Sequence, residues 1–103
     1  MQQQKSKKYH LSTTLYDIID PVKKETTYFI TLDELKHKMK LEELSEDIFK
    51  TKLFNILKKN NIEYTYEQID YAEQEEFLSF LNKKEAMKFI KYLNSGKIKK
   101  DFL

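Results

Sequence analysis

The residues whose chemistry could support catalysis or metal binding are few, and their spacing suits neither. His10 and His37 lie far apart and the chain has no Cys, so it carries no zinc-ligand motif. The Glu pairs at 42–43 and 75–76 are adjacent, so their side chains diverge and do not converge as an acid and a base must. A single Gly leaves no glycine-rich phosphate loop. We therefore predict a protein that is not an enzyme and uses no metal or cofactor.

Charge is distributed unevenly along the chain. Residues 60–82 carry six acidic side chains and no Lys, whereas the other residues hold all 19 Lys and 11 acids, a net charge of +8. A segment of net charge −6 repels a phosphate backbone and attracts a basic protein partner. It is equally typical of a solvated hairpin whose charges keep a strand edge from pairing. If it is a partner-binding surface, its predicted contact residues are Glu67, Asp70, Glu73, Glu75 and Glu76.

Composition indicates one small, mostly ordered domain. The chain has 103 residues, 40% of them hydrophobic, with one Gly and one Pro. We expect a globular domain over residues 9–96, a basic flexible arm at 1–8 and a basic tail at 97–103. The first ten residues lack the apolar core of a signal peptide, and no apolar run approaches the roughly 18 residues that span a bilayer. These features predict a soluble, cytoplasmic protein with no membrane partner and no evident small-molecule substrate.

Residues 45–61 give the clearest helix signal in the chain. Ser45 can cap the first turn, two acids follow it, and two Lys residues precede a stop at Asn60–Asn61. Apolar residues recur on one stripe of a 3.6-residue helix in this segment, and residues 86–93 repeat that spacing. We expect both stripes to join one core that contains Phe49, Leu53, Leu57, Phe89 and Leu93.

Local patterns predict most of the other elements. Residues 25–31 are β-branched and aromatic, as in a buried strand, and Thr31 with Glu34 forms a capping box that opens a helix. Residues 40–44 interrupt the helical phase and indicate a turn. Residues 62–67 alternate apolar and polar side chains, as in a half-exposed strand.

Two segments allow alternative predictions. Residues 9–20 favour a strand by composition, although Ser12 could instead cap a short helix. Residues 76–81 favour a returning strand, although a helix running from Thr65 is the alternative. Asn82 can cap a final helix, and Gly96 stands where that helix should end.

Residues 26–81 thus read strand, helix, turn, helix, strand, acidic loop and strand. This order resembles the winged helix-turn-helix superfamily. The matching segments are YFITLDELKHKMK for the strand and first helix, SEDIFKTKLFNILKKN for the recognition helix, and IEYTYEQ with EEFLSF for the wing. The resemblance implies an α+β fold in which a small antiparallel sheet packs on three helices, with an added C-terminal helix, NKKEAMKFIKYL. The chain departs from the family in a longer, more charged turn and in an acidic wing.

The resemblance also implies nucleic-acid binding, with the second helix in the major groove. Opposite its apolar stripe, that helix carries Thr51, Asn55 and Lys58, flanked by Lys52 and Lys59. Asn can pair with adenine edges, and Lys contacts guanine or phosphate. The same residue types are also ordinary on a solvated helix face.

Two functions are consistent with these patterns. The first is a small winged-helix-like protein that binds DNA or assists a protein that does. The second is a protein-interaction module, an adaptor or an inhibitor, that acts through an acidic hairpin surface at residues 63–76 on a basic protein partner.

Overall fold

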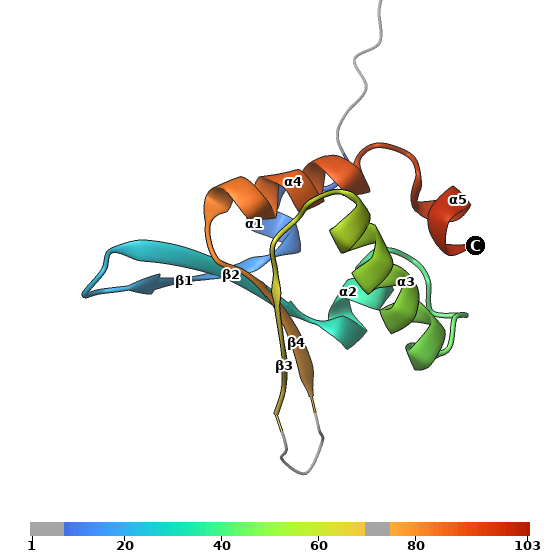
Figure 1. Cartoon of the computed structure of the whole chain (residues 1–103), viewed down its shortest axis with the longest axis horizontal. Helices are drawn as coiled ribbons and strands as arrows, with labels where there is room; N and C mark the ends of the chain where they lie inside the picture. Colours follow the sequence, from blue (N-terminus) through green and yellow to red (C-terminus); the bar gives the residue numbers. More distant parts are fainter. Residues whose placement is uncertain (1–7, 70–74) are drawn as a thin grey trace, which may run out of the picture.

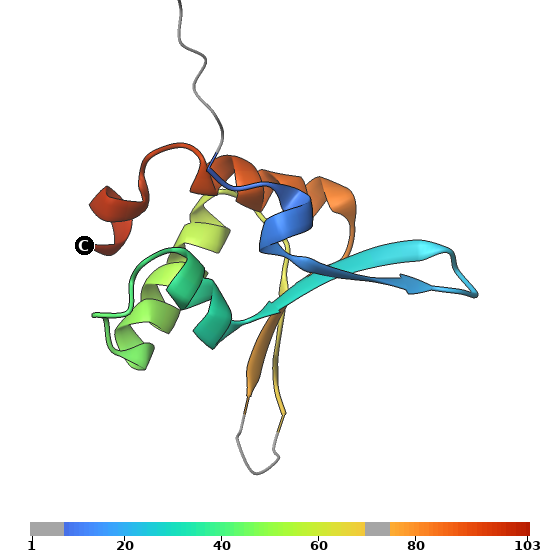
Figure 2. The ribbon, with the colours of Figure 1, turned by 180° about the vertical axis from the view of Figure 1, so that it is seen from behind.

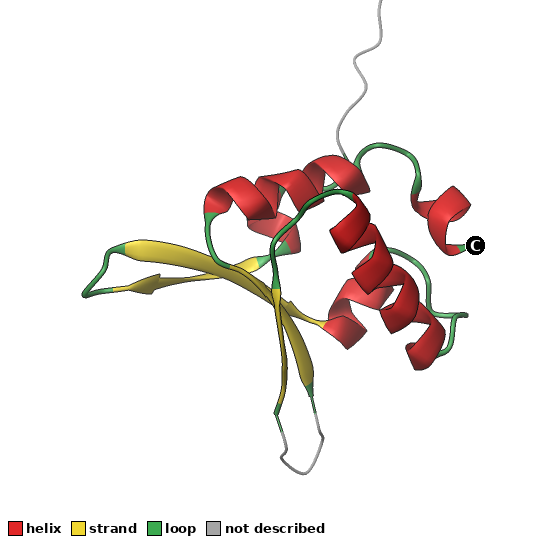
Figure 3. Cartoon of the chain, viewed as in Figure 1, coloured by secondary structure: helices red, strands yellow, loops and turns green. Residues whose placement is uncertain are grey.

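The computed structural model describes residues 8–69 and 75–103 and has the predicted α+β class. The expected arm therefore lies almost wholly outside the described residues. Within the described ranges, no helix is both long enough and apolar enough to cross a membrane. The elements are shown in Figures 1 and 3 and are, in order, α1 (Leu11–Thr14), β1 (Tyr16–Asp20), β2 (Glu25–Thr31), α2 (Leu32–Lys38), α3 (Glu46–Lys59), β3 (Thr65–Gln68), β4 (Glu76–Phe80), α4 (Lys83–Leu93) and α5 (Ile98–Phe102).

The four strands form one antiparallel sheet in the order β1-β2-β4-β3. It consists of two hairpins, β1–β2 and β3–β4, which are joined because β2 pairs with β4 and which leave the body in different directions (Figure 1). Alternate side chains face opposite sides of a strand. Ile30, Leu78 and Phe80 are accordingly fully buried, while their neighbours Phe29 and Phe77 are only half-buried. The sheet therefore buries one face against the helices.

The helix starts predicted from sequence are confirmed. Thr31, Ser45 and Asn82 each accept a hydrogen bond from the backbone N–H three residues further on, at 3.0–3.2 Å. These bonds satisfy donors that an uncapped first turn leaves unpaired. Asn61 follows α3 with a φ of 56°, the left-handed conformation that Asn tolerates. Short polar side chains thus set the beginnings of α2, α3 and α4.

One hydrophobic core contains the buried stripes of both long helices. All five residues that we expected to share a core belong to it and are at most 2% exposed. The inner face of the sheet adds Ile30, Leu78 and Phe80, and Leu35 reaches the core from α2. Seen from behind, α1 and α4 lie together above the sheet (Figure 2). The core therefore lies between the inner sheet face and the long helices.

The structure shows which alternative each of the two ambiguous segments adopts. Residues 76–80 form the returning strand β4, as favoured. The preference for strand over all of residues 9–20 was wrong, because α1 precedes β1 there. This helix begins after His10 and is not capped by Ser12, and Leu15 returns the chain to extended geometry. The described chain consequently has five helices instead of the expected three plus one.

The expected basic tail at 97–103 is also corrected, because most of it folds as α5. The Phe102 ring is fully buried with its centroid 5.8 Å from that of Phe49 on α3. The Tyr92 hydroxyl on α4 donates to Asp101 at 2.8 Å, and burial together with this hydrogen bond raises the pKa of Tyr92. α5 is therefore part of the domain and packs along one side of α3.

We predict that Leu53→Ala lowers the free energy of unfolding by about 2–5 kcal/mol, because it leaves a cavity under a fully buried side chain. Urea denaturation followed by circular dichroism measures this loss. Thr51→Ala, on the exposed side of the same helix, is the matched control and should change stability by less than about 0.5 kcal/mol. A loss below about 1 kcal/mol for Leu53→Ala would contradict the central place of α3 in the core.

Candidate functional site

The position of α3 relative to the β3–β4 hairpin is fixed by aromatic packing. The Phe54 ring stacks on Tyr64 with centroids 5.5 Å apart and planes at 4°, and it meets the edge of Tyr66 at 5.3 Å. Such aromatic pairs stabilise by about 0.5–1.5 kcal/mol beyond the area they bury. The hairpin is therefore held at the side of α3.

A charged cluster strengthens the same contact. The Glu76 carboxylate accepts from the Lys50 ammonium at 2.9 Å and from the Tyr66 hydroxyl at 2.7 Å. Lys50 also lies 5.7 Å from the centre of the Tyr66 ring. Burial raises the pKa of Glu76, but the hydrogen bonds from Lys50 and Tyr66 outweigh it and hold that pKa below its ordinary value. Glu76 therefore stays ionised and ties the hairpin to α3.

Of the five residues predicted to contact nucleic acid, four lie together on the exposed side of α3. Thr51, Asn55, Lys58 and Lys59 are all exposed. Lys52 differs, because it is half-buried beside α5 and donates to the Phe102 carbonyl oxygen at 3.2 Å. The Lys52 ammonium thus makes a contact within the fold. This contact depends on α5, which the sequence analysis did not predict.

The residues predicted to bind a basic partner are divided as well. Glu67 and Glu75 are exposed on the hairpin. Glu76 is instead neutralised by Lys50, so it does not belong to an exposed acidic surface. Asp70 and Glu73 lie outside the described residues. The pairing of Glu76 with Lys50 therefore removes one carboxylate from the predicted acidic surface.

The sheet face that points away from the core carries a row of aromatic rings, which the sequence analysis missed. Ring centroids of Tyr16 and Phe29 are 5.7 Å apart, and those of Phe29 and Phe77 are 6.2 Å apart. Ile18 continues the row on β1 and is 61% exposed, while Glu67 lies opposite Phe77 at its other end. The register of β2 against β4 was needed to find this row, since its members come from three separate strands.

His37 has an acidic partner. Its Nδ1 atom, in the last turn of α2, pairs with Glu42 on the following turn at 2.6 Å, and both side chains are exposed. Among residues 8–69 and 75–103, no group of three His, Cys, Asp or Glu side chains is placed to hold a metal ion.

Comparisons with protein-family models, with curated proteins and with solved structures find no match for this chain.

We predict that Glu76→Gln lowers the free energy of unfolding at pH 7 by about 1–2 kcal/mol, because a charge-assisted contact at a partly exposed site is weakened. The folded pKa of Glu76 is depressed, so the unfolded chain binds more protons as the pH falls. The difference in unfolding free energy between the variant and wild type should thus have its full size well above pH 4.5, the ordinary pKa of Glu, and should disappear as the pH drops below the folded pKa.

Urea denaturation at a series of pH values tests this prediction. Glu67→Gln makes the same charge change at an exposed position of the same hairpin and serves as the control. A stability gap for Glu76→Gln that does not change with pH would mean that the carboxylate charge is not what connects the hairpin to α3.

Proposed function

We propose that this chain is a small, non-enzymatic, winged-helix-like protein that binds DNA, directly or as an accessory to another protein. The helix pair α2–α3 lies between β2 and β3 along the chain, and the strands around it pair in the order β2-β4-β3. The observation that carries the proposal is the exposed side of α3. It is the one long side of that helix not used by the core, the hairpin or α5 within the described structure.

The exposed side has suitable chemistry for a duplex. Asn55 occupies its middle, where a carboxamide can accept from and donate to an adenine edge in the major groove. Lys58 and Lys59 follow in the last turn, where an ammonium group can contact phosphate. The hairpin differs from a DNA-gripping wing, because exposed Glu67 and Glu75 repel phosphate. In this proposal α3 enters the groove and the hairpin stays off the backbone.

We expect Asn55→Ala to weaken the binding free energy for a selected duplex by about 1–3 kcal/mol, because it removes a contact to one base. Duplexes in which that base is changed should lose little affinity. Lys58→Ala should weaken binding to all sequences and reduce the slope of log affinity against log salt by about 0.9. Fluorescence anisotropy over a salt series measures both effects.

The control for these measurements is Lys23→Ala, at the exposed turn between β1 and β2, which should leave both affinity and slope nearly unchanged. Absence of duplex binding by the wild-type chain at low salt would reject this function.

A second candidate function is supported by the aromatic row on the outer sheet face. Half-buried Phe29 and Phe77, next to exposed Ile18 and flanked by Glu67, have the make-up of a protein-binding surface with an apolar centre and an acidic edge. A partner for this surface would be basic, as in the adaptor or inhibitor hypothesis.

The double variant Glu67→Lys with Glu75→Lys distinguishes the two functions by the sign of its effect. Under the DNA-binding function, affinity for duplex should rise, because two repulsive charges become attractive. Under the second function, binding to a synthetic peptide of alternating Lys and Leu, measured by calorimetry, should be lost. Failure of the wild type to bind this peptide would count against the second function.

A further inference from the structure

The excess positive charge of this chain is concentrated away from α3. Residues 9–59 contain nine Lys and nine acidic residues and are neutral overall, although they include α3. Residues 83–103 contain seven Lys and only two acids, a net charge of +5. The basic part of the described surface is thus built by α4 and α5.

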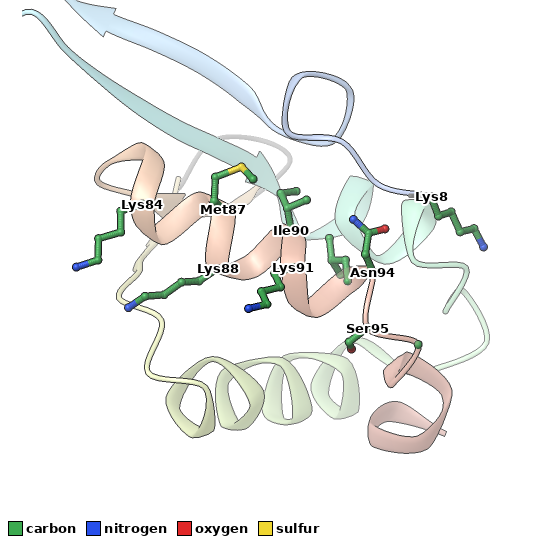
Figure 4. A pocket seen from close by; sticks show the side chains of 10 residues that line it. Lys8, Lys84, Met87, Lys88, Ile90, Lys91, Asn94 and Ser95 are labelled. Atoms are coloured by element: carbon green, nitrogen blue, oxygen red, sulfur yellow. The ribbon is translucent and has the colours of Figure 1, made fainter. Parts of the chain in front are cut away.

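The outer side of α4 is a continuous basic face. Its inner side buries Phe89 and Leu93 in the core, whereas Lys84, Lys88 and Lys91 project from the other side at helical spacing (Figure 4). Met87 points to a different side of α4 from these Lys residues and is 39% exposed (Figure 4). Residues four and three apart are neighbours on a helix surface, so these ammonium groups form one cluster.

Both acids of this region are occupied by internal contacts. Glu85 is buried and accepts from the backbone N–H of Glu63 at 3.0 Å, with Lys88 at 3.1 Å. The N–H of Glu63 and the ammonium of Lys88 hold the pKa of Glu85 below its ordinary value, against the effect of burial. Asp101 accepts from the Tyr92 hydroxyl. Lys84 and Lys91 have no ion-pair partner in the part of the chain that the structure describes.

A groove of about 960 Å³ runs over this face, and none of the described residues that line it is acidic (Figure 4). The Asn94 side chain bonds the backbone N–H and carbonyl of Tyr9, both at 2.8 Å, which places Lys8 on the same groove. Lys88 donates to the Asn61 carbonyl at 3.0 Å, just beyond the end of α3. The basic face therefore joins the last turn of α3, where Lys58 and Lys59 lie.

The floor of the groove limits what can bind there. Ile90 and Leu93 are only 3% and 2% exposed, so it offers no deep apolar hole for an anchoring side chain. The lining also lacks aromatic rings on which a base could stack. The charged groups that this groove offers to a ligand are Lys ammonium groups, which suit a ligand with regularly repeated negative charge.

We propose that Lys84 and Lys91, together with Lys8, bind the phosphate backbone of the same nucleic acid that α3 reads, while Lys88 is held between Glu85 and the end of α3. This inference rests on the proposed function and names a second, sequence-independent contact. From Lys84 to Lys91 the helix axis advances about 10 Å, along which a duplex presents about six phosphate charges. The α4 face thus supplies the affinity that the acidic hairpin does not supply.

The test is the double variant Lys84→Glu with Lys91→Glu, measured by anisotropy with a labelled mixed-sequence duplex over a salt series. Both side chains are exposed, so the fold should persist, and circular dichroism checks this. We expect affinity at 0.1 M salt to fall at least about tenfold and the log–log slope to decrease by about 1.8, the loss of two phosphate contacts. Base preference set by Asn55 should not change.

The matched control is Lys23→Glu with Lys24→Glu, which makes the same charge change at the exposed turn between β1 and β2. It should change affinity less than about twofold. Equal losses in the two variants would show an effect of net charge alone and overturn the proposal.

The remaining outcomes separate this inference from the function on which it rests. Unchanged duplex binding by the α4 variant, with Asn55→Ala still defective, overturns the inference and leaves the proposed function intact. No duplex binding by wild type overturns both. Binding of poly-glutamate in place of duplex, lost in the α4 variant, would reassign this face to an acidic polypeptide.

Discussion

The burial of α3 is the constraint on which the other contacts depend. Its apolar stripe closes the core between the helices and the inner sheet face, and Leu53 at its centre is fully buried. Because that side is fixed, Phe54 and Lys50 must meet the β3–β4 hairpin, and Phe49 and Lys52 must meet α5. One side remains exposed. The surface that α3 can offer to a partner is thus the side that does not pack against the core, the hairpin or α5.

Local physics explains which parts of the fold the sequence could predict. Capping by Ser45 and Asn82, the stripe on α3 and the alternation over residues 62–67 each depend on residues close together in the chain, so they can be read without knowing the fold. α5 could not be recognised in this way, because two apolar residues in a Lys-rich segment resemble a solvated tail. Phe102 becomes a core residue only when Phe49 is placed beside it.

The candidate site shows the same limit more sharply. Helical spacing correctly grouped Thr51, Asn55, Lys58 and Lys59 on one side of α3. It could not reveal that Lys52 donates to a residue 50 positions away, or that Glu76 is neutralised by one 26 positions away. The net charge counted along a segment overstates the charge on the surface wherever a charged side chain is paired through a tertiary contact. Likewise, the aromatic row requires the strand register, which no local pattern supplies.

The fold also resolves an apparent conflict in the charge distribution. An acidic hairpin beside α3, whose four Lys and two acidic residues give it a net charge of only +2, would be a poor surface for a polyanion if these were the whole contact. The packing of α4 changes this balance, because it buries Glu85 and turns Lys84 and Lys91 outward, and the bond from Lys88 to Asn61 joins that face to the end of α3. Under the proposed function, base reading by α3 and attraction of phosphate by α4 would then be divided between two helices. α3 can present few charges, since its sides are occupied by packing, while α4 needs no base-reading side chains.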